Sequence, residues 1–391
     1  MLSIFVCLRL YLLGCAVIML ISCSLLLFSS STILPVRART KKQKGALETI
    51  LFIRHELMVA CESASHAAGD EPIVVGGHKG VIQRGPKAPN DSATITKKST
   101  GWEVLMYLGM ALRIDETMCA LAAMAPKIVA VLSPEGENSG VWISVEKEEN
   151  RPILEAFYDG LRKAGLHTHG YSEFMDTARW SVCLIDVTDG MLLPCVADIK
   201  IGYIRHSPHT PPEKMARIQK KRLIQPLAIR LCGALHHFYR TISNEQCIER
   251  ETCEKDIGYL LHKDEDHRRC LRAFFSSTVS MKQEGSGNKC SDSEVLSARL
   301  KACCRHVEKL LSFFTSSVGC ALLERTAFVS TSLLLLYDAV SCVSDKVGNN
   351  DAADVRVYLI DYARVSDRRL NFTEENIGFL RGLENFLFLI S

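Results

Sequence analysis

Residues 194–202 read PCVADIKIG, an apolar run of the kind that forms β-strands, yet it contains an acid and a base two positions apart. Successive side chains of a strand point to opposite faces, so Asp198 and Lys200 would share one face, roughly 7 Å apart, while the alternate apolar residues face a core. The run therefore predicts a strand whose acid and base face one cleft. The alternative is a structural ion pair on an edge strand, because charge pairs also occur away from active sites.

The bulk composition is that of an ordinary globular chain. It has 391 residues, of which 47% are hydrophobic and 23% charged, so it can bury a sizeable core. The formal net charge of +3 is too small to indicate a nucleic-acid-binding surface, which needs clustered basic residues. Direct nucleic-acid binding is therefore not expected, and an anionic partner must be bound by a local group of basic residues.

Sixteen cysteines are scattered along the chain without a CxxC pair. A chain of this size needs no disulfides for stability, so reduced thiols in the cytosol or the nucleus are expected. The cluster HKDEDHRRC brings His262, His267 and Cys270 together, but its spacing matches no established zinc pattern. It is interpreted as a solvated, charge-rich turn.

The first 34 residues form a hydrophobic leader whose only charged residue is Arg9. An uncharged run of 18 residues, YLLGCAVIMLISCSLLLF, is long enough for a transmembrane segment, and basic residues follow it within the linker 35–70. The leader is therefore expected to be a signal anchor, with the rest of the chain in the cytosol. A true start downstream, for instance at Met58, and a cleaved targeting peptide remain alternatives.

The folded body is expected to begin near residue 71. The stretch EPIVVGGHKGVIQ suggests a hairpin whose glycine-rich turn could approach a phosphate, although an ordinary tight hairpin would have the same sequence. Lys97 and Lys98 close a polar stretch, and helical apolar spacing begins at residue 101 with Glu103 in the first turn. The runs VWISV and WSVCLIDVTDG are predicted strands.

A basic helix is predicted directly after the PCVADIKIG strand. The segment HTPPEKMARIQKKR opens with prolines, which the first turn of a helix tolerates, and Lys214, Arg217 and Lys221 then share one face. That face is a local site for anions, or else a solvated helix surface. Residues 227–240 and 293–314 are also predicted to be amphipathic helices.

A late strand, DVRVYLIDYARV, carries an acid near its end. Alternation would place Asp361 on the same face as three apolar residues, and an acid at the end of a strand suits a metal ligand at the mouth of a cleft. The last segment, NIGFLRGLENFLFLI, is predicted to close the core as a helix.

Together these features are the components of a phosphoryl-transfer site. That chemistry depends on positioning and charge neutralisation, with lysine on the phosphates, a metal ion on the acids and an aspartate near the attacking hydroxyl. The residues required are a glycine-rich turn, a lysine with a first-turn glutamate, an acid and a base on one strand face, a basic helix and a late acid.

The same residues resemble a known family. PCVADIKIG fits the PxxxDxKxG signature of the inositol polyphosphate kinases, and VGGH, IDVTDGMLLPC, TSLLLLYD, LIDYARV and GFLRGLENFLFLI are similar to other landmarks of that family in the right order. The resemblance spans about residues 71–391. The short basic segment EKMARIQKK resembles the multikinases of the family more than the trisphosphate 3-kinases, which have a larger inositol-binding insertion.

The resemblance implies an α+β, two-lobed protein-kinase-like fold with antiparallel sheets and ATP between the lobes. The N-lobe would span about 71–186 and the C-lobe about 187–391. Asp198 and Lys200 would be catalytic, with Asp198 orienting the inositol hydroxyl or accepting its proton. The residues that would bind ATP and its Mg²⁺ are Lys97 (or its neighbour Lys98), Glu103, Asp186, Val187 and Ser332, together with Asp361 as the metal ligand.

The resemblance also implies where the substrate phosphates bind. Lys214, Arg217, Lys221 and Arg364 would contact them, because charge-assisted hydrogen bonds to phosphate are strong. The sequence departs from the family pattern at Ile185, Thr331, Tyr362 and Arg364. Arg364 stands where a histidine is usual and would be a fixed, planar cation.

The leading functional hypothesis is an ATP- and Mg²⁺-dependent multikinase that phosphorylates inositol trisphosphate and tetrakisphosphate. Within the same class, the alternatives are an inositol hexakisphosphate kinase and a phosphoinositide kinase, the latter favoured by the hydrophobic leader. The non-enzyme alternative is a membrane-tethered scaffold that has lost catalysis. The chain is expected to act as a monomer, with its kinase domain in the cytosol or the nucleus and possible membrane contact through the leader alone.

Overall fold

In the computed structural model, all the described residues belong to the unit Asp70–Ser391. The described residues are 72–75, 82–134, 139–167, 172–203, 212–213, 215–216, 227–242, 245–276, 292–339, 355–362, 366–367 and 374–391. The predicted hydrophobic leader and linker, residues 1–70, lie outside these ranges. Among the helices that are described, none is long and apolar enough to cross a membrane.

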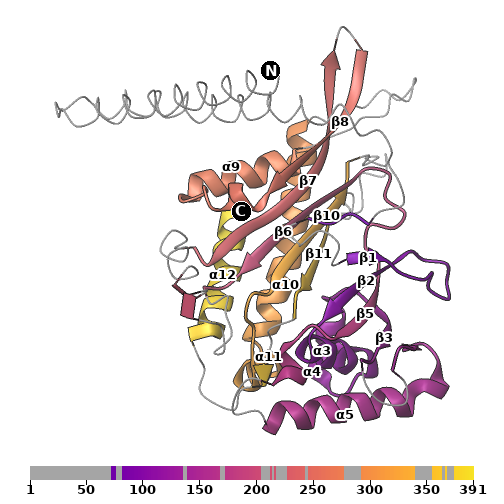
Figure 1. The fold of residues 1–391 in the computed structure, drawn as a ribbon. Coiled ribbons are helices and arrows are strands. Elements are labelled where there is room, and N and C mark those ends of the chain that lie inside the picture. Colours follow the sequence, from indigo (N-terminus) through magenta and orange to yellow (C-terminus); the bar gives the residue numbers. More distant parts are fainter. Residues whose placement is uncertain are drawn as a thin grey trace, which may run out of the picture. The chain divides into compact units, whose positions relative to one another are not determined.

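The first half of the unit is built on a five-stranded antiparallel sheet in the order β1-β2-β5-β3-β4 (Figure 1). Helix α3 packs against its strands β3 and β5, and α5 packs against α3. The strands are β1 (Ile82–Arg84), β2 (Thr94–Ser99), β3 (Ile128–Leu132), β4 (Trp142–Ser144) and β5 (Trp180–Ile185). The helices are α3 (Gly101–Leu112), α4 (Glu116–Ala122), the 3₁₀ turn η1 (Glu148–Asn150), α5 (Arg151–His167) and α6 (Glu173–Asp176).

The second half is built on another five-stranded antiparallel sheet in the order β11-β10-β6-β7-β8. Its strands are β6 (Pro194–Ile201), β7 (Ile229–Ile242), β8 (Glu245–Glu254), β10 (Ser332–Asp338) and β11 (Arg356–Ile360), while β9 (Thr326–Ala327) and β12 (Ser366–Asp367) form a separate pair. The helices are α8 (Lys255–Gly258), α9 (Asp264–Phe275), α10 (Asp292–Thr315), α11 (Ser317–Arg325) and α12 (Glu374–Ile390). The expected α+β fold with antiparallel sheets is confirmed.

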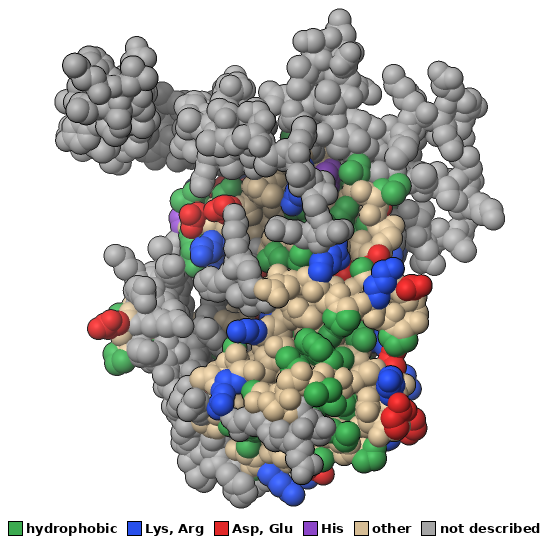
Figure 2. All heavy atoms as spheres, turned by 45° about the vertical axis from the view of Figure 1, so that its right-hand side comes forward, with side chains coloured by type: hydrophobic (Ala, Val, Ile, Leu, Met, Phe, Trp, Pro, Cys, Tyr) green, Lys and Arg blue, Asp and Glu red, His purple; other side chains and the backbone are tan. Residues whose placement is uncertain are grey.

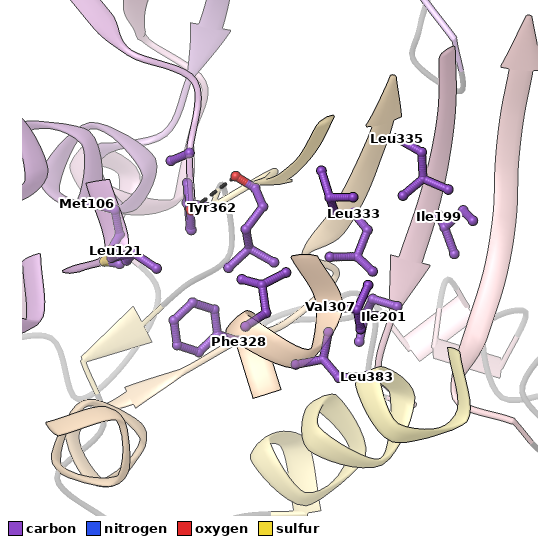
Figure 3. Close-up of a cluster of buried hydrophobic side chains, with 14 of the residues drawn as sticks. Met106, Leu121, Ile199, Ile201, Val307, Phe328, Leu333, Leu335, Tyr362 and Leu383 are labelled. Atoms are coloured by element: carbon purple, nitrogen blue, oxygen red, sulfur yellow. Dashed lines mark hydrogen bonds between the residues drawn. The ribbon is translucent and has the colours of Figure 1, made fainter. Parts of the chain in front are cut away.

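A continuous hydrophobic core runs from the first sheet to the second (Figure 3). The apolar face of β6 contributes Ile199 and Ile201 to it, and α12 packs on β6 and β7. Tyr107 of α3 meets Tyr362, which follows β11, edge to face with ring centroids 5.4 Å apart. The backbone of β11 is also tied to the end of α4, because Leu359 donates to the carbonyl of Met124 at 2.7 Å. The core thus fixes the first sheet and its helices relative to the end of β11.

Charge is dispersed over the face of the described residues that Figure 2 draws. Lysine, arginine and acidic side chains lie scattered among hydrophobic ones and do not gather into one basic surface on that face. This distribution agrees with the small net charge of +3.

Several sequence predictions are wrong in detail. Residues 227–240 were predicted to be a helix, but from Ile229 onward they belong to strand β7. The reason is that a short apolar run buried on both faces, such as 231–235, cannot be told from a helix by its spacing. The supposed charge-rich turn at 262–270 instead includes helix α9, whose three first-turn acids suit the positive end of the helix dipole. Residues 72–75 form no strand, and the glycines of the predicted turn lie outside the described residues.

The predicted helices at the end of the chain are confirmed. The pattern of 293–314 corresponds to α10, and the closing segment corresponds to α12. Strand β6 also forms where predicted, but it lies in the middle of its sheet between β10 and β7. The alternative of an ion pair on an edge strand is therefore wrong.

Candidate active site

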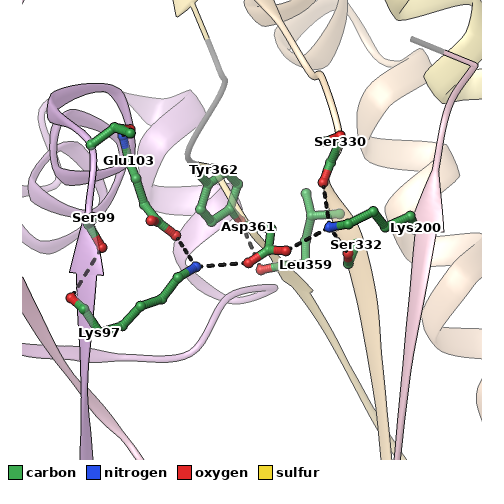
Figure 4. A network of polar contacts seen from close by, with 10 residues as sticks. Lys97, Ser99, Glu103, Lys200, Ser330, Ser332, Leu359, Asp361 and Tyr362 are labelled. Atoms are coloured by element: carbon green, nitrogen blue, oxygen red, sulfur yellow. Dashed lines mark hydrogen bonds and ion pairs between the residues drawn. The ribbon is translucent and has the colours of Figure 1, made fainter. Parts of the chain in front are cut away.

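Lys97 is held between the two halves of the fold. It lies in β2, and its Nζ is 2.8 Å from Glu103 Oε1 and 2.8 Å from Asp361 Oδ1 (Figure 4). The neighbouring Lys98 is exposed, so Lys97 is the lysine that faces the site. Thr100 caps α3 by accepting a hydrogen bond from the backbone N–H of Glu103 at 3.3 Å, which is the first half of a Thr-x-x-Glu capping box. This cap places the fully buried Glu103 beside Lys97.

Asp361 bridges two lysines from different sheets. Its Oδ1 accepts from Lys97 at 2.8 Å, and its Oδ2 accepts from Lys200 at 2.7 Å. The residue follows β11 directly and has a positive φ of 66°, a conformation that non-glycine residues adopt at a cost of about 1–3 kcal/mol. The alternation of the strand therefore does not set its direction, contrary to the sequence expectation. The turn brings a side chain that is 30% exposed to the lysines.

Lys200 is fixed by neighbours on β10. In the β6–β10 register it lies opposite Ser332, and its Nζ donates to Ser332 Oγ at 3.1 Å and to the carbonyl of Ser330 at 3.0 Å. Ser330 has a positive φ of 60°, so two strained residues, Ser330 and Asp361, meet at one ammonium group. Lys200 forms its ion pair with Asp361, and no ion pair joins it to Asp198, its neighbour on the strand.

The charges of the site reinforce one another. Burial acts to lower the pKa of Lys97, but the carboxylates of Asp361 and Glu103 outweigh burial and raise it. The pKa of Lys200 is raised in the same way by Asp361 and Asp198. Burial acts to raise the pKa of Asp361, but Lys200 and Lys97 hold it well below its usual range. The lysines therefore stay cationic and Asp361 anionic at neutral pH.

Asp198 is in a different electrostatic state. Asp198 lies in β6 and is only 5% exposed. Its Oδ1 is buried and has no hydrogen-bond partner among the described residues. Burial raises the pKa of this carboxyl, and the nearby negative charge of Asp361 adds to the effect, while Lys200 opposes it. A buried carboxylate oxygen without a donor is costly, so this atom is an open acceptor at the site.

Asp186 and Val187 lie at the end of β5, where the first sheet leads toward the second. The Asp186 carboxylate forms an ion pair with Arg84 and accepts two hydrogen bonds from Thr188, at 3.0 Å from N and 2.6 Å from Oγ1. Its backbone N–H is bonded to the carbonyl of Ala93 at 2.9 Å. The side chain of Asp186 therefore shapes the turn that follows β5.

The predicted phosphate contacts lie outside the described residues: Lys214, Arg217, Lys221 and Arg364. Sequence reasoning also missed two residues of the site. Arg230 and Cys232 lie on β7 beside Asp198 and Lys200, and they were overlooked because this segment was interpreted as a helix. The adjacent Gly233 could have weakened the helix interpretation, because glycine is unfavourable inside a helix.

The acids of the site fit a metal ion that is bound together with phosphates. Within the described ranges, no three His, Cys, Asp or Glu side chains are grouped to hold a metal by themselves. Mg²⁺ usually binds one or two carboxylates and completes its coordination with phosphate oxygens and water. Asp361, with its partly exposed carboxylate, can supply such a ligand.

The site is that of a kinase-type phosphotransferase, because it combines a lysine paired with a buried first-turn glutamate, a second lysine, a partly exposed carboxylate and a carboxylate oxygen without a donor. Comparison with known proteins agrees: the sequence model of a family described as inositol polyphosphate kinase matches residues 181–391. The chain therefore belongs to the inositol polyphosphate kinase family, whose members are ATP-dependent phosphotransferases. The family resemblance of the sequence is confirmed.

Individual relatives are distant. Over 338 residues the chain is 22% identical to inositol hexakisphosphate kinase 3 of Mus musculus, covering 80% of this chain and 78% of the relative. It is similar to a solved inositol phosphate multikinase of S. cerevisiae in complex with ADP and Mn²⁺, at 15% identity and a TM-score of 0.46, covering 76% of this chain and 97% of the other. Another solved inositol phosphate multikinase has 20% identity and a TM-score of 0.35, covering 53% of this chain and 83% of the other.

Proposed function

We propose that this protein is a multikinase that uses ATP and Mg²⁺ to phosphorylate hydroxyl groups of inositol trisphosphate and tetrakisphosphate. The observation that carries the proposal is the buried, unpartnered Oδ1 of Asp198 beside Lys200. A hydroxyl acceptor can donate a hydrogen bond to this oxygen, whereas an acceptor phosphate would bring negative charge against a carboxylate. The site therefore favours a kinase that acts on hydroxyls.

Each residue of the site has a task in this reaction. Asp198 accepts the proton of the hydroxyl as its oxygen attacks the γ-phosphorus of ATP, and the bond from that phosphorus to the β–γ bridging oxygen breaks. The ammonium group of Lys200 stabilises the negative charge that develops on the transferred phosphoryl group. Lys97, oriented by Glu103, binds the phosphates of ATP. Mg²⁺, held by Asp361, would neutralise charge on those phosphates.

The remaining assignments extend this proposal to nucleotide and substrate recognition. Asp186 and Val187 would lie at the adenine, and Ser332, which is bonded to Lys200, would lie near the metal and the nucleotide. The basic residues Lys214, Arg217, Lys221 and Arg364 would bind substrate phosphates. Residues 71–391 would form the kinase domain, acting as a monomer in the cytosol or the nucleus.

A second candidate is an inositol hexakisphosphate kinase, which forms pyrophosphates. The similarity to the mouse hexakisphosphate kinase favours it. The two candidates differ in the acceptor group, because one phosphorylates a free hydroxyl and the other a phosphate. Product identification therefore separates them.

The experiment is to incubate the full-length chain with ATP and Mg²⁺ against inositol tris-, tetrakis- and hexakisphosphate, and to separate the products by charge. We expect the tris- and tetrakisphosphates to be converted to higher phosphates, and the Lys200→Ala variant to lose at least about 10²-fold in turnover. Conversion of the hexakisphosphate alone would favour the second candidate. Binding of ATP without conversion of any inositol phosphate would contradict the proposal and favour a phosphoinositide kinase or a scaffold.

A further inference from the structure

Arg230 lies on the same sheet face as the candidate catalytic residues. In the β6–β7 register it is the partner of Lys200, and partners across an antiparallel pair project to the same face. The register shifts between Asp198 and Ile199, so Cys232 is the extra residue of β7 at this point. Such a bulge redirects side chains, and it leaves Arg230 and Cys232 in contact beside Asp198.

The guanidinium of Arg230 is held in place by Tyr259, which lies outside strands β6 and β7. One of its terminal nitrogens donates to the hydroxyl of Tyr259, which follows α8, and its Cζ lies 4.8 Å from the centre of the Tyr259 ring. The other terminal nitrogen is 3.3 Å from Cys232 Sγ. Among the described residues, no carboxylate forms an ion pair with this guanidinium, so its charge is positioned by neutral groups.

Among the residues that the structure describes, two polar atoms on this face have no hydrogen-bond partner. Asp198 Oδ1 is a buried acceptor without a donor, and Arg230 Nε is a buried donor without an acceptor. Leaving such atoms unsatisfied is unfavourable, and more so where the group is charged. They do not bond to each other, although Asp198 and Arg230 lie on adjacent strands on either side of the bulge. A ligand with a donor and an anionic acceptor side by side would satisfy both.

The order of the strands indicates whether the phosphate donor or the acceptor substrate lies next to Arg230. The contacts of Asp361 and Ser332 lie on the β11 and β10 side of β6, and Arg230 lies on the opposite side, in β7 (Figure 1). The phosphate donor would bind on the β10 side, next to Lys97 and Asp361. Arg230 therefore faces the acceptor substrate.

We propose that Arg230 binds a substrate phosphate on the ring carbon next to the hydroxyl that Asp198 contacts, so that the enzyme phosphorylates hydroxyls adjacent to an existing phosphate. The inference rests on the proposed function and specifies its substrate geometry. Arginine suits this role because its planar fork binds phosphate oxygens in pairs, which lysine cannot reproduce. The Tyr259 contact fixes the guanidinium before the substrate arrives, and this reduces the ordering cost of binding.

The first test measures binding by the full-length chain without ATP, so that it does not depend on turnover. The probe is inositol 1,2,3-trisphosphate, titrated by calorimetry into the wild type and the Arg230→Lys and Arg230→Gln variants. We expect the Kd to rise about 10- to 100-fold, the scale of a lost charge-assisted hydrogen bond. The Kd for ATP should stay within about twofold. Tyr259→Phe, which keeps the ring and loses the hydroxyl, should show a smaller rise for the same ligand.

The control is Arg268→Gln. Arg268 also stacks on an aromatic ring, at 4.4 Å from the centre of Phe388, but it bonds to backbone carbonyls of α12 and lies away from the site. Neither Kd should change in this variant. If the Arg230 variants bind the inositol phosphate as tightly as the wild type, or lose ATP equally, Arg230 has only a structural role and the inference is overturned.

The second test is the position of the new phosphate, determined by NMR. In inositol 1,2,3-trisphosphate the hydroxyls at positions 4 and 6 adjoin a phosphate and the hydroxyl at position 5 does not, so we expect products at positions 4 or 6. Initial phosphorylation at position 5 would overturn the inference while leaving the proposed kinase activity intact. A wild-type chain that binds and converts no inositol phosphate would refute both.

Discussion

Replacing Lys97 should destabilise the fold, because this lysine pairs with both Glu103 and Asp361. In Lys97→Met, the fully buried Glu103 loses its ion-pair partner, and Asp361 keeps only Lys200. Methionine is close to lysine in length and fills the same space without a charge. The change therefore tests electrostatics more than packing.

The expected loss of stability follows from the two ion pairs of Lys97, with Glu103 and with Asp361. At 2.8 Å and an effective dielectric constant of about 20, each Lys97–carboxylate pair has a gross Coulomb energy of about 6 kcal/mol. The cost of removing the charges from water offsets much of this. Removing one partner of a buried pair nevertheless destabilises by about 3–5 kcal/mol, because a charge stays buried and unpaired. We expect a loss of about 3–4 kcal/mol, since Asp361 is 30% exposed and can be hydrated.

The assay is urea unfolding of the full-length chain, followed by circular dichroism. Lys98→Met is the matched control, because this neighbouring lysine is exposed, and it should change stability by less than about 0.5 kcal/mol. The double variant Lys97→Met/Glu103→Gln should recover about 2 kcal/mol, because it removes the unpaired charge. Equal effects of the two lysine variants, or a loss below about 1 kcal/mol for Lys97→Met, would refute the reasoning.

Three further predictions test other parts of the structure. Asp198→Asn should lower turnover at least about 10²-fold and yet stabilise the fold by about 1 kcal/mol at neutral pH. Because burial raises the folded-state pKa of Asp198, the wild type loses stability as pH rises from the unfolded value of about 3.9 through the folded one. The melting-temperature advantage of the variant should therefore be larger at neutral pH than below the unfolded pKa, and a constant advantage would contradict this. Asp361→Asn should abolish the extra rise in melting temperature that Mg²⁺ gives to the ATP-bound wild type, and an unchanged rise would exclude Asp361 as a metal ligand. Gly258→Ala should destabilise strongly, because a Cβ there would lie 1.9 Å from the carbonyl oxygen of Leu231, whereas Gly160→Ala, in an open part of α5, should stabilise by about 0.5–1 kcal/mol; similar melting temperatures for the two variants would be inconsistent with this packing.

The elements that carry the site differ in how well the sequence predicts them. The strand with Asp198 and Lys200 was predictable because its alternation is local, and α3 was predictable because its apolar residues recur at helical spacing. Strand β7 was misassigned because residues 231–235 in its first half are buried on both faces, which removes the alternation that marks a strand. Arg230 was missed for the same reason.

The sequence by itself determined the chemical inventory: an acid and a base in one strand, a lysine before a helix with a first-turn glutamate, and a late acid after another strand. These are local patterns, because residue type and spacing are sufficient to define them. Only the tertiary structure decided which charges meet. Lys200 pairs with Asp361, which is 161 positions away, and not with its neighbour Asp198. Such partnerships depend on strand order, register and the positive φ of a single residue, and long-range packing fixes these features of the fold.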